Sequence, residues 1–562
     1  MGCFDLTKTL CDEISTMIFR YWWSQVDKEN KMHWIAWDKL VKPKKDGGLG
    51  FRDLHLFNIA MLAKQAWRIL QDPSSLCARV LGARYFPDGN ILAAKPRAGI
   101  SYTWRSILKG LDLLKQGIVW RVGNGQNIKI WDDPWLPRGI TRRPSSTRGQ
   151  NLLENVEDLI NPVTGMWDVE LVNQTFCTED AKVVLSIPIF EGFEDSIAWH
   201  PEPKGNFTVK SAYKLNLQLR AEKNGENCST STAKITTSQT TSQWGKIWHL
   251  NVPKKIAMFL WRFTHNSLPL RTNIRRRGMD IDTLCPCCQR LDEDGGHLFL
   301  KCKFARACWH AAILEEQCLK LVACSSAQEV MDCIFQFGDQ LAMQVTTLLW
   351  CIWSARNKFN AGESAPTADA VAANCSLHIL QFTEHLKGGN QTKTNRRCKW
   401  SPPPSDFFDG AYSGNTREGG WGFCARTKEG SVWGAGMGRL THLSDALQAE
   451  AFACLQAIQF ARDAGMSRII FETDATNLKD ALCSNVYDLS QHSTIFKKAK
   501  YMLSTSFIEY EVVSCVRECN CVTHKLAGQG ASMEPGAHML WHGTVPDFEI
   551  SDVASEYVML SG

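Results

Sequence analysis

Three carboxylates in apolar surroundings constrain the fold of this chain more than any other feature. They are Asp409 in Phe-Phe-Asp-Gly, Glu450 in Gln-Ala-Glu-Ala-Phe-Ala and Asp474 in Phe-Glu-Thr-Asp-Ala. A lone charge in such a setting would be costly to bury. The first and third close strand-like runs and the second lies in a helix-like segment, so we expect all three acids to converge on a sheet-plus-helix frame. Because Mg²⁺ binds through carboxylate oxygens, this arrangement predicts a pair of Mg²⁺ ions and metal-assisted cleavage of a phosphodiester.

Length and composition predict several folded domains in a reducing compartment. A chain of 562 residues has room for about three or four domains. An apolar share of 44% and 21 Trp indicate buried cores. The 22 cysteines follow no repeating framework and no secretory signal opens the chain, so we expect free thiols or metal ligation in an intracellular setting, nuclear or cytoplasmic. The net charge of +5 is compatible with nucleic-acid binding without being evidence for it.

We expect no membrane partner. The apolar run around Leu348–Trp353 is too short to span a bilayer and is soon interrupted by Arg356. The start Met1-Gly2-Cys3 would suit N-myristoylation only with Ser or Thr where this chain has Leu6.

Two polar stretches divide the chain into three blocks. Residues 222–243 are rich in Ser and Thr, and residues 387–404 combine glycines, a basic cluster and three prolines. Both compositions are typical of linkers. They leave an N-terminal block, a middle block near 244–386 and a C-terminal block from about 405.

The N-terminal block mixes predicted helices and hairpins. Apolar spacing predicts a helix at Leu54–Leu70, and Val119–Trp131 reads as a hairpin around Gly123-Asn124-Gly125. The pair Asp132-Asp133 superficially resembles a polymerase acid pair, but Pro134 follows it and we expect a polar turn. Four tryptophans are most simply core or interface residues, with stacking on bases as the alternative: Trp22, Trp23, Trp34 and Trp37.

A compact set of metal-ligand residues lies in the middle block. Cys285 and Cys288 are spaced so that one tight turn offers two thiolates to the same ion; eight residues separate Cys288 from His297, and four separate His297 from Cys302. This Cys₃His set suits structural Zn²⁺, and with four protein ligands it should organise structure rather than catalyse. Cys287 is either a bystander or a substitute for a neighbour. The alternative to a metal site is coincidence in a cysteine-rich chain.

Basic residues and tryptophans flank this set. The basic residues are Lys254, Lys255, Arg262, Arg271, Arg275, Arg276 and Arg277, and the tryptophans are Trp244, Trp248 and Trp261. Basic groups among aromatic rings suit contact with a nucleic-acid backbone and stacking on its bases. The alternative is a solvated helix face over a Trp-rich core.

The C-terminal block predicts alternating strands and helices. The expected elements are strands at 407–410, 421–426 and 432–440, a helix at 445–464, strands at 468–474 and 507–516, and a last helix holding Arg517-Glu-x-Asn520-x-x-x-His524-x-Leu-Ala527. We expect the first strand to end in a glycine turn and Ser444 to cap the first helix. Small residues let that helix approach the sheet and bring Glu450 into the packed layer, where a cation is its natural partner. Asp474 ends a strand, a usual place for ligand-binding groups. Glu472 is either an accessory acid or an ion-pair partner.

This order of elements, with the acids in these places, resembles the ribonuclease H fold, and more specifically the ribonuclease H-like domain of plant LINE-type, non-LTR retrotransposons. The landmarks are Asp409-Gly410, Glu450, Asp474 and the terminal Arg/Asn/His/Leu motif. Residues 244–312, with W-x-x-x-W, P-K-K, F-x-W-R and the Cys/His set, are similar to the zinc-binding reverse transcriptase domain of that family. Residues 21–137 resemble the segment that follows its polymerase palm.

The resemblance implies a multidomain α+β and α/β protein. It has a helical zinc-binding domain in the middle and a C-terminal ribonuclease H-like fold, a mixed sheet with flanking helices. The implied division is 1–221 post-polymerase (thumb- or connection-like) segment, 222–243 linker, 244–312 zinc-binding domain, 313–386 helical connector, 387–404 linker, 405–532 ribonuclease H-like domain and 533–562 tail. The sequence of the connector and of the tail gives no functional signal.

The implied activity is endonucleolytic hydrolysis of the RNA strand of an RNA–DNA hybrid, with no small-molecule substrate. Asp409, Glu450 and Asp474 would hold two Mg²⁺ ions, one activating the attacking water and the other stabilising the leaving oxygen. The 2′-hydroxyl distinguishes the RNA strand. His524 stands where many ribonucleases H carry a fourth acid; it either orients water and assists product release or is a plain helix residue.

Other functions fit parts of the sequence. A catalytically weak remnant would bind nucleic acid through the zinc and basic regions, and an unselected pseudogene product would have no function. DNA-cutting integrases share the acid pattern, but the terminal motif matches the ribonuclease branch. No Tyr/Phe-x-Asp-Asp motif occurs, so we expect a truncated or host-retained fragment that does not copy RNA into DNA.

Overall fold

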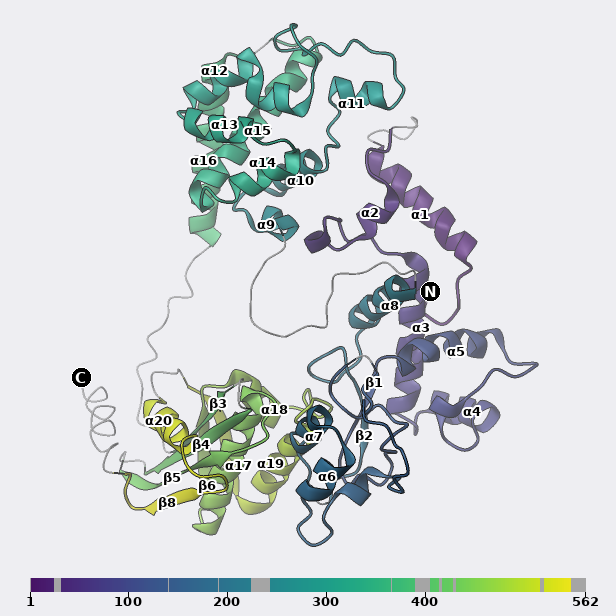
Figure 1. Cartoon of the computed structure of the whole chain (residues 1–562), viewed down its shortest axis with the longest axis vertical. Coiled ribbons are helices and arrows are strands. Elements are labelled where there is room, and N and C mark those ends of the chain that lie inside the picture. Colours follow the sequence, from purple (N-terminus) through teal and green to yellow (C-terminus); the bar gives the residue numbers. More distant parts are fainter. Residues whose placement is uncertain are drawn as a thin grey trace. The chain divides into compact units, whose positions relative to one another are not determined.

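The computed structural model describes residues 2–24, 32–139, 141–190, 192–223, 243–364, 366–389, 405–413, 417–427, 431–515 and 520–546. The side chains of 243, 384–389 and 405–413 are outside this description. The chain divides into two compact units: Met1–Leu6, Leu56–Ala233 and Lys399–Gly562 form one, and Thr7–His55 and Lys234–Cys398 form the other (Figure 1). The two expected linkers lie almost entirely outside the described residues.

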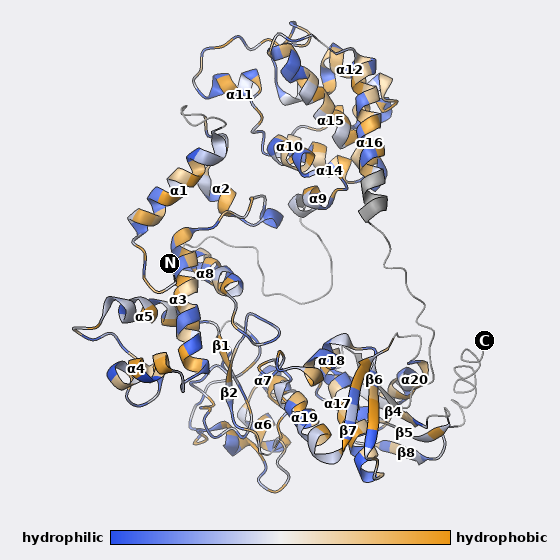
Figure 2. Ribbon diagram, turned by 180° about the vertical axis from the view of Figure 1, so that it is seen from behind, coloured by the Kyte–Doolittle hydropathy of each residue, from blue (hydrophilic) through white to orange (hydrophobic). Residues whose placement is uncertain are grey.

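The second unit is built from helices. They are α1 (Lys8–Trp23), α2 (Trp37–Val41), η1 (Lys44–Asp46), α9 (Gln243–His249), α10 (Lys254–Thr264), α11 (Arg271–Arg276), η4 (His297–Lys301), α12 (Lys303–Ala311), α13 (Glu315–Val322), α14 (Ala327–Ile334), α15 (Asp339–Asn360) and α16 (Ala368–Gly389). The helical character expected of 313–386 is therefore confirmed. Figure 2 shows the alternation of hydrophobic and hydrophilic residues along α1, which is typical of an amphipathic helix. Among the described helices, none combines the length and apolarity needed to cross a bilayer.

The packing of this unit explains most of its tryptophans. Trp261 on α10 is fully buried and its indole donates a hydrogen bond to the Gly47 carbonyl at 2.8 Å. His265 Nε2 lies 2.7 Å from the same carbonyl, and Trp244 stacks on the His265 ring at 4.4 Å between centroids. Trp23, Trp34, Trp37 and Trp248 pack around the same cluster. These half-buried rings pack against the core, as the simpler of the two readings predicts, whereas Trp22 is exposed and departs from that reading.

The first unit contains an N-terminal subdomain, residues 56–223. Its elements, with the helix that leads into it, are α3 (Leu54–Gln71), α4 (Leu76–Tyr85), η2 (Ile91–Ala93), α5 (Tyr102–Lys115), β1 (Ile118–Arg121), η3 (Val156–Leu159), α6 (Val169–Thr175), α7 (Thr178–Leu185), β2 (Ser196–Trp199) and α8 (Val209–Lys223). Helix α3 matches the helix predicted at Leu54–Leu70. Asp133 accepts a hydrogen bond from the Lys129 amide at 2.8 Å within a turn, as expected of the Asp132-Asp133 pair.

The hairpin predicted at Val119–Trp131 is wrong. Strand β1 pairs antiparallel with β2, which lies far along the chain. The Asp195 carboxylate accepts hydrogen bonds from the amides of Gly123, Gly125 and Asn127 at 2.8–2.9 Å. These bonds bind the glycine-rich loop to the start of β2, so the amides that a hairpin would use are taken by a side chain.

The C-terminal part of this unit is a six-stranded mixed sheet with helices on both faces (Figure 1). Its elements are β3 (Ser405–Ser413), β4 (Glu418–Arg426), β5 (Val432–Leu440), α17 (Ala446–Asp463), β6 (Arg468–Thr473), α18 (Thr476–Cys483), α19 (Ser493–Ser506), β7 (Glu509–Ser514), α20 (Cys521–Gly530) and β8 (His538–His542). The strand order is β7-β6-β3-β4-β5-β8. β3, β4 and β5 form the predicted antiparallel meander, and β6 pairs parallel with β3 and β7.

Residues of β4 alternate between two cores. Trp421 and Phe423 pack with α17, whereas Cys424 packs with Val522 and Leu526 of α20. Gly422 allows α20 to lie at backbone distance, because an added Cβ would stand 2.6 Å from the Ala527 amide nitrogen. The ribonuclease H-like fold expected of this region is confirmed by this layered arrangement.

Three local expectations are corrected. β3 continues to Ser413, so Asp409 lies inside the strand rather than at a glycine turn. Helix α17 is capped by Asp445, whose side chain accepts from the Gln448 amide, and not by Ser444. The sheet extends past the boundary predicted at residue 532, because His538–His542 of the predicted tail form β8 beside β5.

The N-terminal subdomain packs directly on the sheet domain within the first unit. Gln448 on α17 is buried and donates to the Ser186 carbonyl at 3.0 Å. Thr494 at the start of α19 donates to the Pro188 carbonyl at 2.9 Å. Arg121 of β1, also buried, donates to the Leu489 carbonyl at 3.3 Å. The helix that carries Glu450 is thus held by its own domain and by the N-terminal subdomain.

Candidate functional site

The strand register places two of the three acids level with each other. Phe407 of β3 is paired with Glu472 of β6 in a parallel ladder. Asp409 and Asp474 each follow two residues later, so their backbones are level just beyond this ladder, Asp409 within β3 and Asp474 directly after β6. Ligand sites form at the carboxyl ends of parallel strands in such sheets, and β6 ends here. The side chain of Asp409 is outside the described part of the chain. Glu472 is half-buried on β6.

Glu450 comes to this region on α17, which packs against β3 and β4. Its side chain is half-buried, and the residue one turn later, Cys454, is fully buried. Burial, assisted by the negative charge of Glu450, raises the pKa of the Cys454 thiol. Cys454 therefore stays protonated near neutral pH and does not compete with Glu450 for a hard cation.

The Asp474 carboxylate contacts the side-chain amide of Asn520, the residue just before the last helix. Asp474 is half-buried directly after β6, and Asn520 Nδ2 lies 3.5 Å from its Oδ1. Asn520 is itself buried just before α20 and accepts a hydrogen bond from the Thr523 hydroxyl. The terminal sequence motif included Asn520, but the sequence analysis assigned it no role. Its position one turn before His524 was the feature that could have indicated one.

His524 is exposed on α20, one turn after Asn520. Its backbone amide donates to the Asn520 carbonyl at 3.1 Å. Arg517 of the same motif lies outside the described residues. Helix α20 thus carries His524, and the residue just before this helix supplies the amide that contacts Asp474.

The four metal-ligand residues of the middle block come together. One ligand atom from each of Cys285, Cys288, His297 and Cys302 lies within 4.8 Å of all the others. The sulfurs of Cys285 and Cys302 are 4.0 Å apart, and Cys288 Sγ is 3.2 Å from His297 Nε2. Tetrahedral Zn²⁺ with Zn–S bonds of about 2.3 Å separates its sulfur ligands by about 3.8 Å. The cluster therefore fits a single four-coordinate ion.

The local backbone aims these side chains inward. The amide of Cys285 donates to the Leu291 carbonyl at 2.8 Å, and the Cys285 carbonyl accepts from the Gln289 amide at 2.8 Å, which folds the chain between them into a knuckle. Gln289 completes it with a positive φ of 49°. Hydrogen bonds from the Cys287 and Cys302 thiols hold the pKa of the Cys285 thiol below its ordinary value. Cys287 is not a member of the four-residue cluster.

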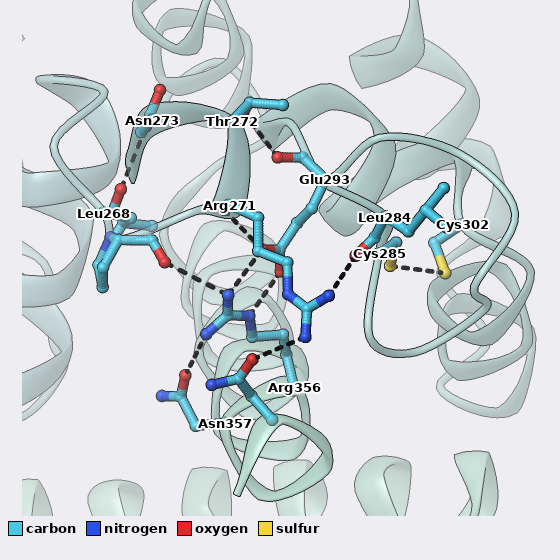
Figure 3. A network of polar contacts seen from close by, with 12 residues as sticks. Leu268, Arg271, Thr272, Asn273, Leu284, Cys285, Glu293, Cys302, Arg356 and Asn357 are labelled. Atoms are coloured by element: carbon cyan, nitrogen blue, oxygen red, sulfur yellow. Dashed lines mark hydrogen bonds and ion pairs between the residues drawn. The ribbon is translucent and has the colours of Figure 1, made fainter. Parts of the chain in front are cut away.

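A buried ion pair braces this knuckle (Figure 3). Glu293, fully buried, contacts Arg356 of α15 through Arg356 Nε to Oε1 at 2.5 Å and Nη2 to Oε2 at 2.6 Å. The Arg271 amide donates to Glu293 Oε2 at 2.8 Å, and the Arg271 guanidinium donates to the Leu284 carbonyl at 3.0 Å. Glu293, after Cys285, is therefore bonded to the Arg356 guanidinium and to the Arg271 backbone amide. Leu284, before Cys285, is bonded to the Arg271 guanidinium. Arg356 was visible in the sequence only as a charge that interrupts an apolar run.

The flanking basic residues do not form one uniform surface. Arg271 belongs to the network of Glu293, and Arg277 donates to the Trp34 carbonyl at 2.9 Å. Lys255 lies 4.6 Å from the Trp350 ring centroid. By contrast, Arg275 and Arg276 on α11 are exposed. Part of the basic cluster is structural and part of it faces solvent.

Two families match the regions that carry these sites. Residues 207–309 match the family described as zinc-binding in reverse transcriptase. Residues 407–530 match the family described as reverse transcriptase-like. The first match contains all four metal-ligand residues, and the second contains Asp409, Glu450, Asp474 and His524.

Two plant proteins and two solved structures resemble the chain. A protein of Arabidopsis thaliana provisionally named as a ribonuclease H protein is 24% identical over 571 residues, covering 97% of this chain and 88% of that protein. An uncharacterized mitochondrial protein of Arabidopsis thaliana is 44% identical over 137 residues, covering 24% of this chain and 89% of that protein. Ribonuclease H1 of the archaeon Halobacterium salinarum is 21% identical with a TM-score of 0.20, covering 23% of this chain and 96% of its own. The N-terminal ribonuclease H domain of a Mycobacterium tuberculosis protein is 15% identical with a TM-score of 0.21, covering 23% and 95%.

Proposed function

We propose that this chain, which belongs to the family of retrotransposon-derived proteins with a reverse transcriptase zinc-binding domain and a ribonuclease H-like domain, hydrolyses the RNA strand of RNA–DNA hybrids. The observation that carries the proposal is the register of the parallel strands. It brings the backbones of Asp409, within β3, and Asp474, directly after β6, level with each other, and α17, which carries Glu450, packs on β3 and β4. A nuclease of this type agrees with the family matches; hybrid specificity and metal dependence are our proposal.

Asp409, Glu450 and Asp474 would hold two Mg²⁺ ions, which would activate water and stabilise the leaving oxygen. The chain contributes the placement of these acids. Asn520 Nδ2 lies 3.5 Å from Asp474 Oδ1, and we assign this amide a part in orienting that carboxylate. We assign His524 to the edge of the site, where an imidazole can orient water or assist product release without adding negative charge.

The middle domain contains most of the match to the zinc-binding family. We propose that Cys285, Cys288, His297 and Cys302 hold one Zn²⁺ ion. Their mutual distances within 4.8 Å support this assignment. Four protein ligands leave no open coordination position, so the ion would stabilise the fold of the domain and take no part in hydrolysis.

A panel of substrates tests the nuclease proposal with the full-length chain. We expect cleavage of the RNA strand in a labelled RNA–DNA hybrid with Mg²⁺, no cleavage with EDTA, and no cutting of double-stranded DNA or double-stranded RNA. Equal cutting of hybrid and double-stranded DNA would contradict the hybrid specificity. Binding of the hybrid without any cleavage by folded protein would instead favour a nucleic-acid-binding remnant.

A further inference from the structure

A cavity of about 560 Å³ lies in the helical unit beside the metal-ligand cluster. The end of α10, the loop after it, α11, the segment before His297, η4 and the start of α14 surround it. Its volume falls within the range of about 300–1,000 Å³ typical of ligand sites. None of the activities assigned above uses this cavity.

The lining of the cavity combines three kinds of groups. Phe263, Phe299 and Leu270 are buried and give it an apolar floor. Thr264, Asn273 and Ser325 contribute side-chain oxygens to the lining. The hydrogen-bond donors of these three side chains are used within the protein, on Leu260, Asn266, Leu268 and Glu329, so their oxygens remain as acceptors. Arg276 and Lys301 are exposed and bring two positive charges to its edge. Asp294 is the acid in this lining, and its Oδ1 accepts from the His297 amide at 2.6 Å.

The two cations differ from their neighbours in the basic run. The guanidinium groups of Arg271 and Arg277 donate hydrogen bonds to the Leu284 and Trp34 carbonyls, at 3.0 and 2.9 Å. Arg276 and Lys301 come from different elements, α11 and η4, and both line the same cavity. Two cations brought together from separate elements mark a place where an anionic group can be bound.

We propose that this cavity binds one nucleotide of a single-stranded nucleic acid. Its phosphate is taken by Arg276 and Lys301, and its base enters the cavity over the apolar floor. The Arg276 and Lys301 cations offer donors to a phosphate, and the Thr264 and Asn273 side-chain oxygens offer acceptors to the amino group of a base edge. Single-stranded nucleic acid is recognised by this combination of cations along the backbone and apolar contact with splayed bases.

The test measures binding of a fluorescent single-stranded DNA oligonucleotide to the full-length chain by anisotropy, across a range of salt concentrations. Single-stranded DNA is not a substrate of the nuclease proposed above, so failure of one proposal does not decide the other. The double variant Arg276→Ala, Lys301→Ala should bind at least about tenfold more weakly. Its salt slope should fall by about 0.7, the contribution of one neutralised phosphate on a single strand.

The matched control removes two exposed cations from α12, Lys303→Ala with Arg306→Ala, which lie outside the lining. It should bind within about threefold of the unaltered chain. An equal loss in both double variants would mean diffuse attraction and would overturn the proposal, as would unchanged binding in both.

A second variant blocks the cavity without changing charge. At Gly295, which lines the cavity, an added Cβ would meet only Leu270 Cδ1, at 3.8 Å. Gly295→Phe, with its melting temperature and zinc content measured to establish that it folds, should reduce oligonucleotide binding by a similar factor. Normal binding by this folded variant, or binding of an acidic peptide with no binding of the oligonucleotide, would also overturn the proposal.

Discussion

Arg356 and Glu293 form a buried ion pair in which two guanidinium nitrogens meet the two carboxylate oxygens at 2.5 and 2.6 Å. They come from different parts of the helical unit, 63 residues apart in the chain. Glu293 lies between Cys288 and His297, and Arg356 lies on α15, beyond the region that matches the zinc-binding family. The helical connector is therefore part of the support of the metal-ligand cluster.

Arg356→Met should destabilise the helical unit by about 3–5 kcal/mol, because it leaves the Glu293 charge buried without its partner. Thermal or urea unfolding of the full-length chain measures the change. Lys358→Met, at an exposed position on the same helix, should change stability by no more than about 0.5 kcal/mol. Similar effects of the two substitutions would contradict the bracing role of Arg356.

Cys285→Ser should remove bound zinc and destabilise the helical unit, since metal binding and folding are coupled in such sites. Cys287→Ser is the matched control, because Cys287 lies between two proposed ligands but outside the cluster. Zinc content after purification without chelator checks both. Equal zinc loss in the two variants would refute the assignment of Cys287 as a bystander, and absence of zinc from the unaltered chain would refute the site.

Gly422→Ala should destabilise the sheet domain by about 1–3 kcal/mol through overpacking. The new methyl group would lie 2.6 Å from the Ala527 amide nitrogen and 2.7 Å from the Thr523 carbonyl oxygen. Gly528 lies on the same helix, α20, and has open space where a Cβ would be added. Gly528→Ala should therefore stabilise the domain by up to about 1 kcal/mol. The free energy of unfolding should therefore fall in Gly422→Ala and rise in Gly528→Ala. A change in the same direction in both variants would argue against this packing.

His200 should make the N-terminal subdomain sensitive to acid. Burial, with the nearby charges of Arg142 and Arg121, lowers the pKa of His200 from 6.5 to about 4. The unfolded chain therefore binds a proton at higher pH than the folded chain, and stability should fall as the pH drops from about 6.5 to about 4. The loss amounts to up to about 3 kcal/mol. His200→Gln should flatten this part of the stability profile; an identical profile would contradict the prediction.

The sequence predicted those features that depend on local spacing. The Cys₃His cluster spans only residues 285–302, so its ligands are drawn together by one knuckle and the short helix η4. The meander and α17 follow from strand alternation and from a face of small residues, and both were placed within a few positions of their observed ends.

Features that depend on distant partners escaped prediction. The loop at Gly123 was read as a hairpin because Asp195, whose carboxylate binds its amides, lies about seventy residues away. The charge of Arg356 gave no indication that Glu293 was its partner. The sequence of strand β8 shows no clear strand pattern, and the strand is stabilised by pairing with the edge of β5. In each case the deciding contact joins residues that no local pattern connects.

The most direct test of the central claim is the rate of RNA-strand cleavage in an RNA–DNA hybrid by the full-length chain with Mg²⁺, comparing Asp474→Asn with Asp480→Asn. Asp480 is an exposed acid on the neighbouring helix α18 and serves as the matched control. Loss of a metal ligand removes several kcal/mol of transition-state stabilisation, so Asp474→Asn should cut about 100-fold more slowly or not at all. Asp480→Asn should cut at the rate of the unaltered chain. Full activity in Asp474→Asn would contradict the assignment of this edge of the sheet as the site of hydrolysis.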